Sequence, residues 1–74
     1  MDPLTTLATL VRDAVKAAAS ERQAETITGI SRNTLNRRIA KPGDFTLDEL
    51  DIVARFVGQP DVETLIAHIH GRAA

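Results

Sequence analysis

With 74 residues, of which 43% are hydrophobic and 26% charged, the chain is long enough for one small domain and too apolar for a disordered segment. It contains no cysteine, which excludes disulfide bonds and thiolate metal ligands, and no apolar run near the roughly 20 residues of a membrane-spanning helix. The net charge of −1 does not by itself indicate a nucleic-acid partner, and the acidic start, with Asp2 followed by Pro3, is unlike a signal peptide.

The first predicted helix covers residues 3–19. Asp2 is suited to cap its N-terminus, and Pro3 fits the first helical position. Apolar side chains recur at helical spacing and form one stripe, which Leu10 widens. The members of this stripe are Leu4, Leu7, Val11, Ala14, Val15 and Ala18. We therefore expect the helix to bury this face against the rest of the domain.

A second, shorter helix is predicted from Ser20 to about Ile27. Ser20 and Gln23 have the spacing of a capping box, in which each residue satisfies a backbone N–H of the other. Ala24 and Ile27 are expected to face the core. Gly29 follows, and glycine tolerates the positive φ that a tight turn between two helices requires.

The third predicted helix, residues 31–40, is capped by Ser31 and is unusually polar. Its anchors are few, namely Leu35 and Ile39, with Ile30 just ahead of it. A helix with so little apolar surface usually has a role on its outer face.

Positive charge is concentrated in and just after this third helix. Residues 31–43 contain four basic side chains and no acidic one, which gives +4. Residues 1–30 carry three bases and four acids, and residues 44–74 carry two bases and six acids, which gives −1 and −4. The centre of the chain is thus a basic segment between two acidic ones.

A loop around Pro42 and Gly43 ends the third helix, and Phe45 is expected to pack from it into the core. Thr46 and Glu49 again have capping-box spacing, and the helix that they open is predicted over residues 47–57. Its inward-facing positions are expected to be Leu47, Leu50, Val53, Ala54 and Val57.

The last predicted helix covers residues 62–70 and is expected to end at Gly71. Its apolar stripe consists of Val62, Leu65, Ile66 and Ile69. This stripe either closes the core or forms a two-fold contact with a second copy, and both uses together are possible. His68 and His70 are spaced i, i+2, which places them on different sides of the helix and does not suit a shared metal ion.

No segment alternates with the period of a strand, so the sequence predicts one domain, residues 1–74, with an all-α fold of about five short helices. Residues 21–39 have the organisation of a helix-turn-helix, in which the second helix presents its polar face to the major groove of DNA. Four apolar residues are expected to hold the two helices at a fixed angle. They are Ala24, Ile27, Ile30 and Leu35.

The run GISRNTLNRRI at residues 29–39 resembles the turn and recognition helix of lambda-repressor/Cro-like regulators. The run FTLDEL at residues 45–50 resembles their fourth helix. The resemblance extends roughly over residues 7–69. Within the family, it is strongest to phage repressors and Cro-type proteins, among them those of actinobacterial phages. Two positions differ: Glu25 stands where the family has a small residue, and Thr28 where it has an apolar one. Either the second helix is rotated or the turn differs by one residue.

The resemblance implies base contacts from the outer face of the third helix. The positions concerned are Ser31, Arg32, Asn33, Asn36 and Arg37. Their chemistry agrees, because arginine can bond guanine O6 and N7, and asparagine can bond adenine N6 and N7. Phosphate contacts are expected from Thr34, Arg38 and Lys41, and from Arg22 and Gln23 near the start of the second helix, where a helix N-terminus favours phosphate.

We therefore expect a sequence-specific transcriptional regulator, of repressor or Cro-like type, that occupies operator DNA as a homodimer in the cytoplasm of a bacterial host. Two alternatives remain: an excision or recombination directionality factor, and a protein-interaction module of antitoxin or adaptor type. The sequence shows no catalytic triad, metal-ligand cluster or phosphate-binding loop. Enzymatic activity, a cofactor and a metal ion are therefore not expected.

Overall fold

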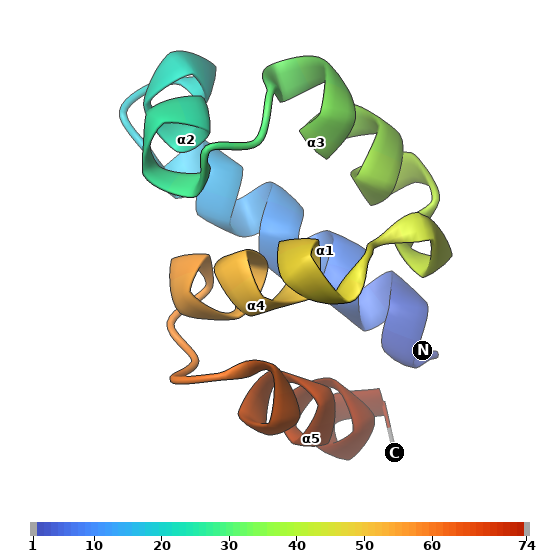
Figure 1. Ribbon diagram of the computed structural model, residues 1–74. Helices are drawn as coiled ribbons and strands as arrows, with labels where there is room; N and C mark the ends of the chain where they lie inside the picture. Colours follow the sequence, from blue (N-terminus) through green and yellow to red (C-terminus); the bar gives the residue numbers. More distant parts are fainter. Residues whose placement is uncertain (1, 74) are drawn as a thin grey trace.

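Five helices and one short 3₁₀ turn make up the computed structural model, which describes the backbone of residues 2–73 and the side chains of residues 2–71. In chain order the elements are α1 (Pro3–Ala17), α2 (Glu21–Thr28), α3 (Arg32–Ala40), η1 (Pro42–Asp44), α4 (Leu47–Phe56) and α5 (Val62–Ala73) (Figure 1). No strand occurs in the described backbone, so the predicted all-α class is confirmed. The radius of gyration, 11.2 Å, matches the value of about 11 Å for a folded chain of this length.

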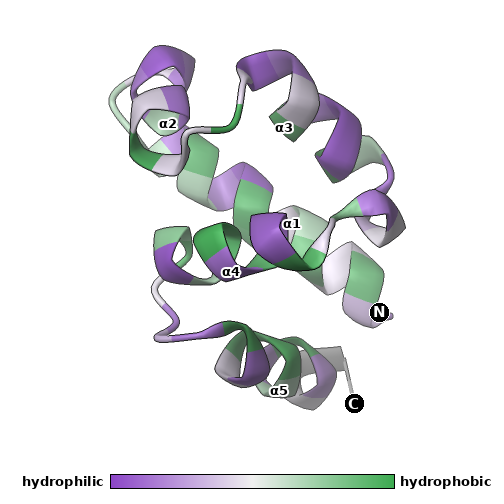
Figure 2. Ribbon diagram, in the orientation of Figure 1, coloured by the Kyte–Doolittle hydropathy of each residue, from purple (hydrophilic) through white to green (hydrophobic). Residues whose placement is uncertain are grey.

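Helix α1 is the centre of the arrangement, because it contacts every other element. Helices α2 and α3 lie together at one end of the molecule and α5 lies at the other (Figure 1). The apolar sides of the helices face one another across the interior, and the outer surface of α3 is mainly hydrophilic (Figure 2). The buried core consists of Leu7, Val11, Ala24, Ile30, Leu35, Phe45, Val53, Ala54, Leu65 and Ile69.

The helix N-termini carry the predicted caps. The Asp2 carboxylate accepts from the Thr5 N–H at 2.9 Å, and the Ser20 hydroxyl accepts from the Gln23 N–H at 3.1 Å, which is one half of the predicted capping box. At α4 the box is complete: the Thr46 hydroxyl accepts from the Glu49 N–H, and the Glu49 carboxylate accepts from the Thr46 N–H.

Four residues of the predicted apolar faces lie at the surface, and one of them is Ile66 of α5. Ile27 is 57% exposed and Leu47 is 74% exposed, and Leu4, in the first turn of α1, is about half exposed. Ile27 points outward because α2 turns Ala24 and Thr28, one helical turn apart, toward the core. At about 100° per residue, Leu47 lies roughly 70° from the centre of the stripe buried by α4, and it occupies that helix's first turn.

The predicted ends of two helices were wrong. Helix α1 ends at Ala17, because Ala18 already has an extended conformation. Helix α5 continues through Gly71 to Ala73. Glycine ends a helix where it adopts positive φ, and in the described backbone only Gly29 and Gly58 do so.

Candidate nucleic-acid interface

The turn between α2 and α3 is built as a helix-turn-helix requires. Gly29 has a φ of +71° and closes α2, and its N–H donates to the Glu25 carbonyl at 2.7 Å. The positive φ therefore lies at Gly29, where the sequence predicts the turn. The inward face of α2 is formed by Ala24 and Thr28.

Thr28 fits this buried position because its hydroxyl is fully used. The hydroxyl donates to the Ala24 carbonyl at 2.7 Å and accepts from the Ile30 N–H at 3.1 Å. Ile30 is itself buried, so its N–H has no access to water. The side chain of Thr28 thus satisfies a backbone group that the turn leaves unpaired.

The N-terminus of α3 is fixed by Ser31. Its hydroxyl accepts from the Thr34 N–H at 3.2 Å and lies 2.9 Å from the Thr34 hydroxyl, to which it donates. Leu35 is buried, and Ile39 packs against the core from one turn further along. One side of α3 is therefore held firmly, and the opposite side is left in solvent.

The outer face of α3 consists of Arg32, Asn33, Asn36 and Arg37, all of which are exposed. At about 100° per residue these four positions fall within an arc of roughly 140°. Asn33, Asn36 and Arg37 make no side-chain hydrogen bond to any described residue, so their amide and guanidinium groups are available to a ligand. The structure thus brings four of the five predicted base-reading residues onto one surface, with Ser31 at its N-terminal edge.

Each flank of α3 carries an arginine–glutamate pair. On the α2 side, Arg32 Nη1 lies 3.3 Å from Glu21 Oε2, and the two side chains are 59% and 53% exposed. On the α4 side, Arg38 donates from Nε to Glu49 Oε1 at 3.0 Å and from Nη2 to Oε2 at 3.5 Å, and these side chains are only 24% and 17% exposed. The first pair is loose and solvated, whereas the second is bidentate and mostly enclosed.

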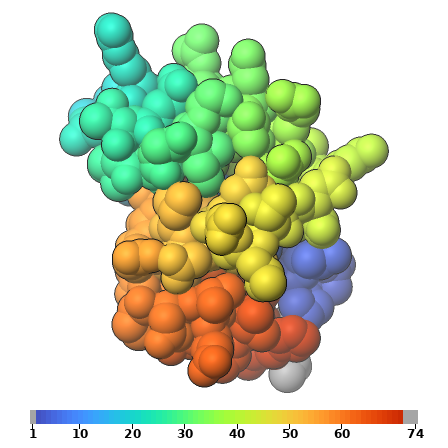
Figure 3. Space-filling model, viewed as in Figure 1, coloured from blue at the N-terminus to red at the C-terminus, as the bar shows by residue number. Residues whose placement is uncertain are grey.

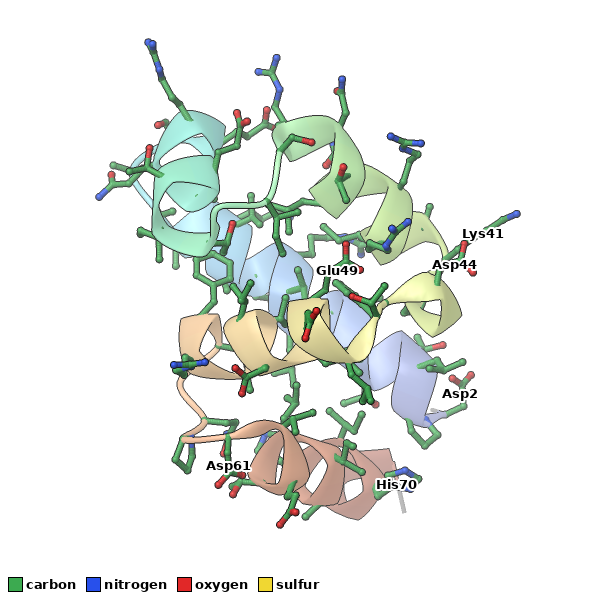
Figure 4. All side chains as sticks on the ribbon, viewed as in Figure 1. Asp2, Lys41, Asp44, Glu49, Asp61 and His70 are labelled. Atoms are coloured by element: carbon green, nitrogen blue, oxygen red, sulfur yellow. The ribbon has the colours of Figure 1, made fainter. Side chains whose placement is uncertain are left out.

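Glu49 lies in the first turn of α4, and its hydrogen bonds link that helix to α3. One oxygen accepts from the Thr46 backbone and from Arg38, and Figure 4 shows the side chain on the side of α4 that faces α3. The hydrogen bond from Arg38, followed by that from the Thr46 N–H, holds the pKa of the Glu49 carboxyl below its ordinary value. The same pair raises the pKa of Arg38, so both groups stay charged.

This geometry changes the expectation for phosphate contacts. Arg38 is engaged with Glu49 and is not free to meet a phosphate, and the half-buried Thr34 is engaged with Ser31. Lys41 extends from the globule just beyond the C-terminal end of α3 (Figure 4). The other predicted phosphate ligands, Arg22 and Gln23, lie exposed in the first turn of α2.

The positive charge is less concentrated than the sequence suggests. Of the four basic side chains in residues 31–43, two are paired with glutamates. The remaining positive groups at this end are Arg37, Lys41 and Arg22, and long side chains stand out from the same end of the molecule (Figure 3).

Sequence reasoning missed the partners of Arg32 and Arg38. Each partner lies 11 residues away along the chain, which no local motif reveals. One signal existed for Arg38, because it follows Leu35 by three residues and so lies beside the buried stripe of α3.

Other kinds of site are not found in the described part of the chain. No group of three or more histidine, aspartate or glutamate side chains could hold a metal ion there, and no described helix is long and apolar enough to cross a membrane. A surface hollow of about 340 Å³ lies between α2 and α4 and is lined by Ile27, Thr28, Ile52, Arg55 and Phe56. The chain matches no family model, no curated protein and no solved structure.

Proposed function

We propose that this protein is a sequence-specific DNA-binding regulator that reads operator DNA with the outer face of α3. One observation carries the proposal: Asn33, Asn36 and Arg37 are exposed and lack partners among the described residues, on a helix whose other side is capped and packed. An α-helix fits the major groove, which is about 12 Å wide. The base edges in that groove supply hydrogen-bond donors and acceptors for the amide and guanidinium groups on the outer face of α3.

Base recognition follows from the side-chain chemistry. The amides of Asn33 and Asn36 are suited to adenine, and the guanidinium groups of Arg37 and Arg32 to guanine. Each bidentate contact of this kind discriminates by roughly 1–3 kcal/mol against the wrong base. Ser31 lies where the N-terminus of the helix meets the groove.

Phosphate contacts are assigned to Lys41, Arg22 and Gln23, which are exposed at the two sides of the reading helix. Arg38 is reassigned from a phosphate ligand to a support of α3, because Glu49 occupies its guanidinium. On this proposal the protein acts in the cytoplasm of a bacterial host, where it represses transcription by covering a promoter. Two copies on a two-fold operator would combine two reading helices about one DNA turn apart.

Selection of bound duplexes from a random pool tests this proposal. We expect an enriched, two-fold symmetric site and an affinity that falls steeply with salt, with a log–log slope of about 0.9 for each phosphate neutralised. Recovery of no preferred sequence, or binding that is independent of salt, would count against base reading and favour the protein-interaction alternative.

A matched pair of variants locates the reading surface. Arg37→Ala should weaken binding to the selected site by roughly 1–3 kcal/mol and relax the preference at one base pair. Arg12→Ala removes the same charge from an exposed position on α1 and should leave the base preference unchanged. Equal losses of Arg37→Ala on selected and random duplexes would refute base reading by this residue.

A further inference from the structure

The pair between Glu21 and Arg32 joins the first residues of α2 and α3 at the proposed DNA surface. Because both side chains are more than half exposed, such a pair contributes little to stability, about 0–1 kcal/mol at most. Its position matters more than its strength. It places a carboxylate beside one of the four side chains of the outer face of α3, next to the end of α2 where phosphate would otherwise be favoured.

Arg32 is only partly occupied by this contact. A single nitrogen, Nη1, lies within bonding distance of Glu21 Oε2, whereas Arg38 uses both Nε and Nη2 on Glu49. A guanidinium has five N–H donors in a planar fork, so the remaining donors of Arg32 are free to bond a guanine edge.

The carboxylate affects the two possible uses of Arg32 differently. A phosphate is attracted by net charge, which Glu21 largely cancels. A guanine edge requires correctly placed N–H donors, and the single hydrogen bond to Glu21 leaves the other donors free while favouring one orientation of the guanidinium. The pair therefore disfavours a phosphate contact, which carries no sequence information, and favours a guanine contact, which does.

We infer that Glu21 is a positioning residue that directs Arg32 to a guanine and away from the DNA backbone. This inference rests on the function proposed above. It assigns to Glu21 a part in discrimination between sequences, although the acidic side chain itself disfavours binding to DNA.

The test compares affinities for the selected duplex and for a random duplex of the same length. Glu21→Gln should tighten binding to random DNA and steepen its salt slope by about 0.9, because Arg32 is released to neutralise one more phosphate. The ratio of the two affinities should fall by about fivefold or more, and repeated selection should relax one base position.

Three further variants separate positioning from bulk charge. Glu21→Asp keeps the charge but is one methylene shorter, so it should relax the same base position without the gain on random DNA. Glu25→Gln removes a charge from the same helix, at a side chain without a hydrogen-bond partner among the described residues, and should not change the base preference. In an Arg32→Ala background, Glu21→Gln should leave the base preference as it is.

An unchanged affinity ratio in Glu21→Gln, with normal selection by the unaltered protein, would overturn this inference alone. The same holds if Glu25→Gln relaxes the same base position to the same extent. If the unaltered protein selects no sequence at all, the proposed function fails together with the inference. Thermal unfolding of each variant verifies that the fold is intact, which is expected because Glu21 is exposed.

Discussion

At the scale of single residues, Thr28 shows how a polar side chain can serve in a small aliphatic core. Its hydroxyl closes α2 by donating to the Ala24 carbonyl and opens the turn by accepting from the Ile30 N–H. An aliphatic residue would fill the same space but would leave that N–H buried without a partner.

Thr28→Val is expected to lower the free energy of unfolding by roughly 1–3 kcal/mol, which is the cost of one unsatisfied buried group. Valine has almost the same shape and a similar helix propensity, so the effect isolates the hydroxyl. Urea unfolding measures it. Thr26→Val is the control, because the Thr26 hydroxyl bonds only the Arg22 carbonyl on an exposed surface. Equal losses in the two variants would contradict the role given to Thr28.

At the scale of elements, α3 is attached to its neighbours through a small number of contacts. Leu35 is its only fully enclosed apolar side chain, and the pair between Arg38 and Glu49 secures the flank toward α4. Glu49 also completes the capping box of α4. One carboxylate therefore links the start of α4 to the last turn of α3.

This link predicts a specific dependence of stability on pH. The pKa of Glu49 is lowered in the folded state, so the carboxylate contributes fully above its ordinary pKa of about 4.5. The contribution is lost as the pH falls through the lower folded value. Hydrogen bonds from the Thr5 and Thr64 backbones also lower the pKa values of Asp2 and Asp61. These two carboxylates therefore add to the loss of stability at low pH, which we call the acid limb.

Glu49→Gln should reduce the free energy of unfolding at pH 7 and make it depend less on pH below about 4.5. Unfolding in urea at a series of pH values measures both effects. Glu63→Gln, at an exposed side chain on α5 with no hydrogen bond to a described residue, should leave the acid limb unchanged. If the free energy of unfolding of Glu49→Gln fell with decreasing pH as steeply as that of the unaltered protein, the link between α3 and α4 would not contribute to stability.

The elements differ in how well the sequence predicts them. The bounds of α3 were correct because local signals define them: the Ser31 hydroxyl at one end and Pro42 just beyond the other. The capping box of α4 was confirmed for the same reason. Which side of α2 is buried depends on neighbouring helices, so Ile27 was placed wrongly. The partners of Arg32 and Arg38 depend on contacts 11 residues apart, and the sequence does not encode those locally.

At the scale of the whole molecule, the apolar stripe of α5 is mainly core. Leu65 and Ile69 are buried against α1 and α4, so these two members of the stripe close the core, which is the first of the two uses expected for it. Val62 is half-buried. Ile66, with 41% of its surface exposed, is the member of the stripe best placed to meet a second copy.

Dimerisation on DNA, if it uses α5, should therefore depend on Ile66. Ile66→Ala is expected to weaken the association of two copies on a symmetric duplex by about 1 kcal/mol or more, as for a central contact residue, with little change on a single half-site. Leu47→Ala removes an even more exposed side chain from α4 and serves as the control. Band shifts at increasing protein concentration measure both. Equal behaviour of the two variants would exclude α5 as the contact.

On the proposed function, the small number of contacts that hold α3 also links DNA affinity to motion within the free protein. Helices of eight and nine residues such as α2 and α3 are unstable in isolation, so the reading surface exists only while their packing holds. Any population in which α3 has detached cannot bind, and the apparent dissociation constant rises in proportion as the competent fraction falls. A substitution in α4 that favours detachment would thus reduce affinity for every sequence by the same factor. Discrimination between sequences would be preserved even as occupancy of the operator declined.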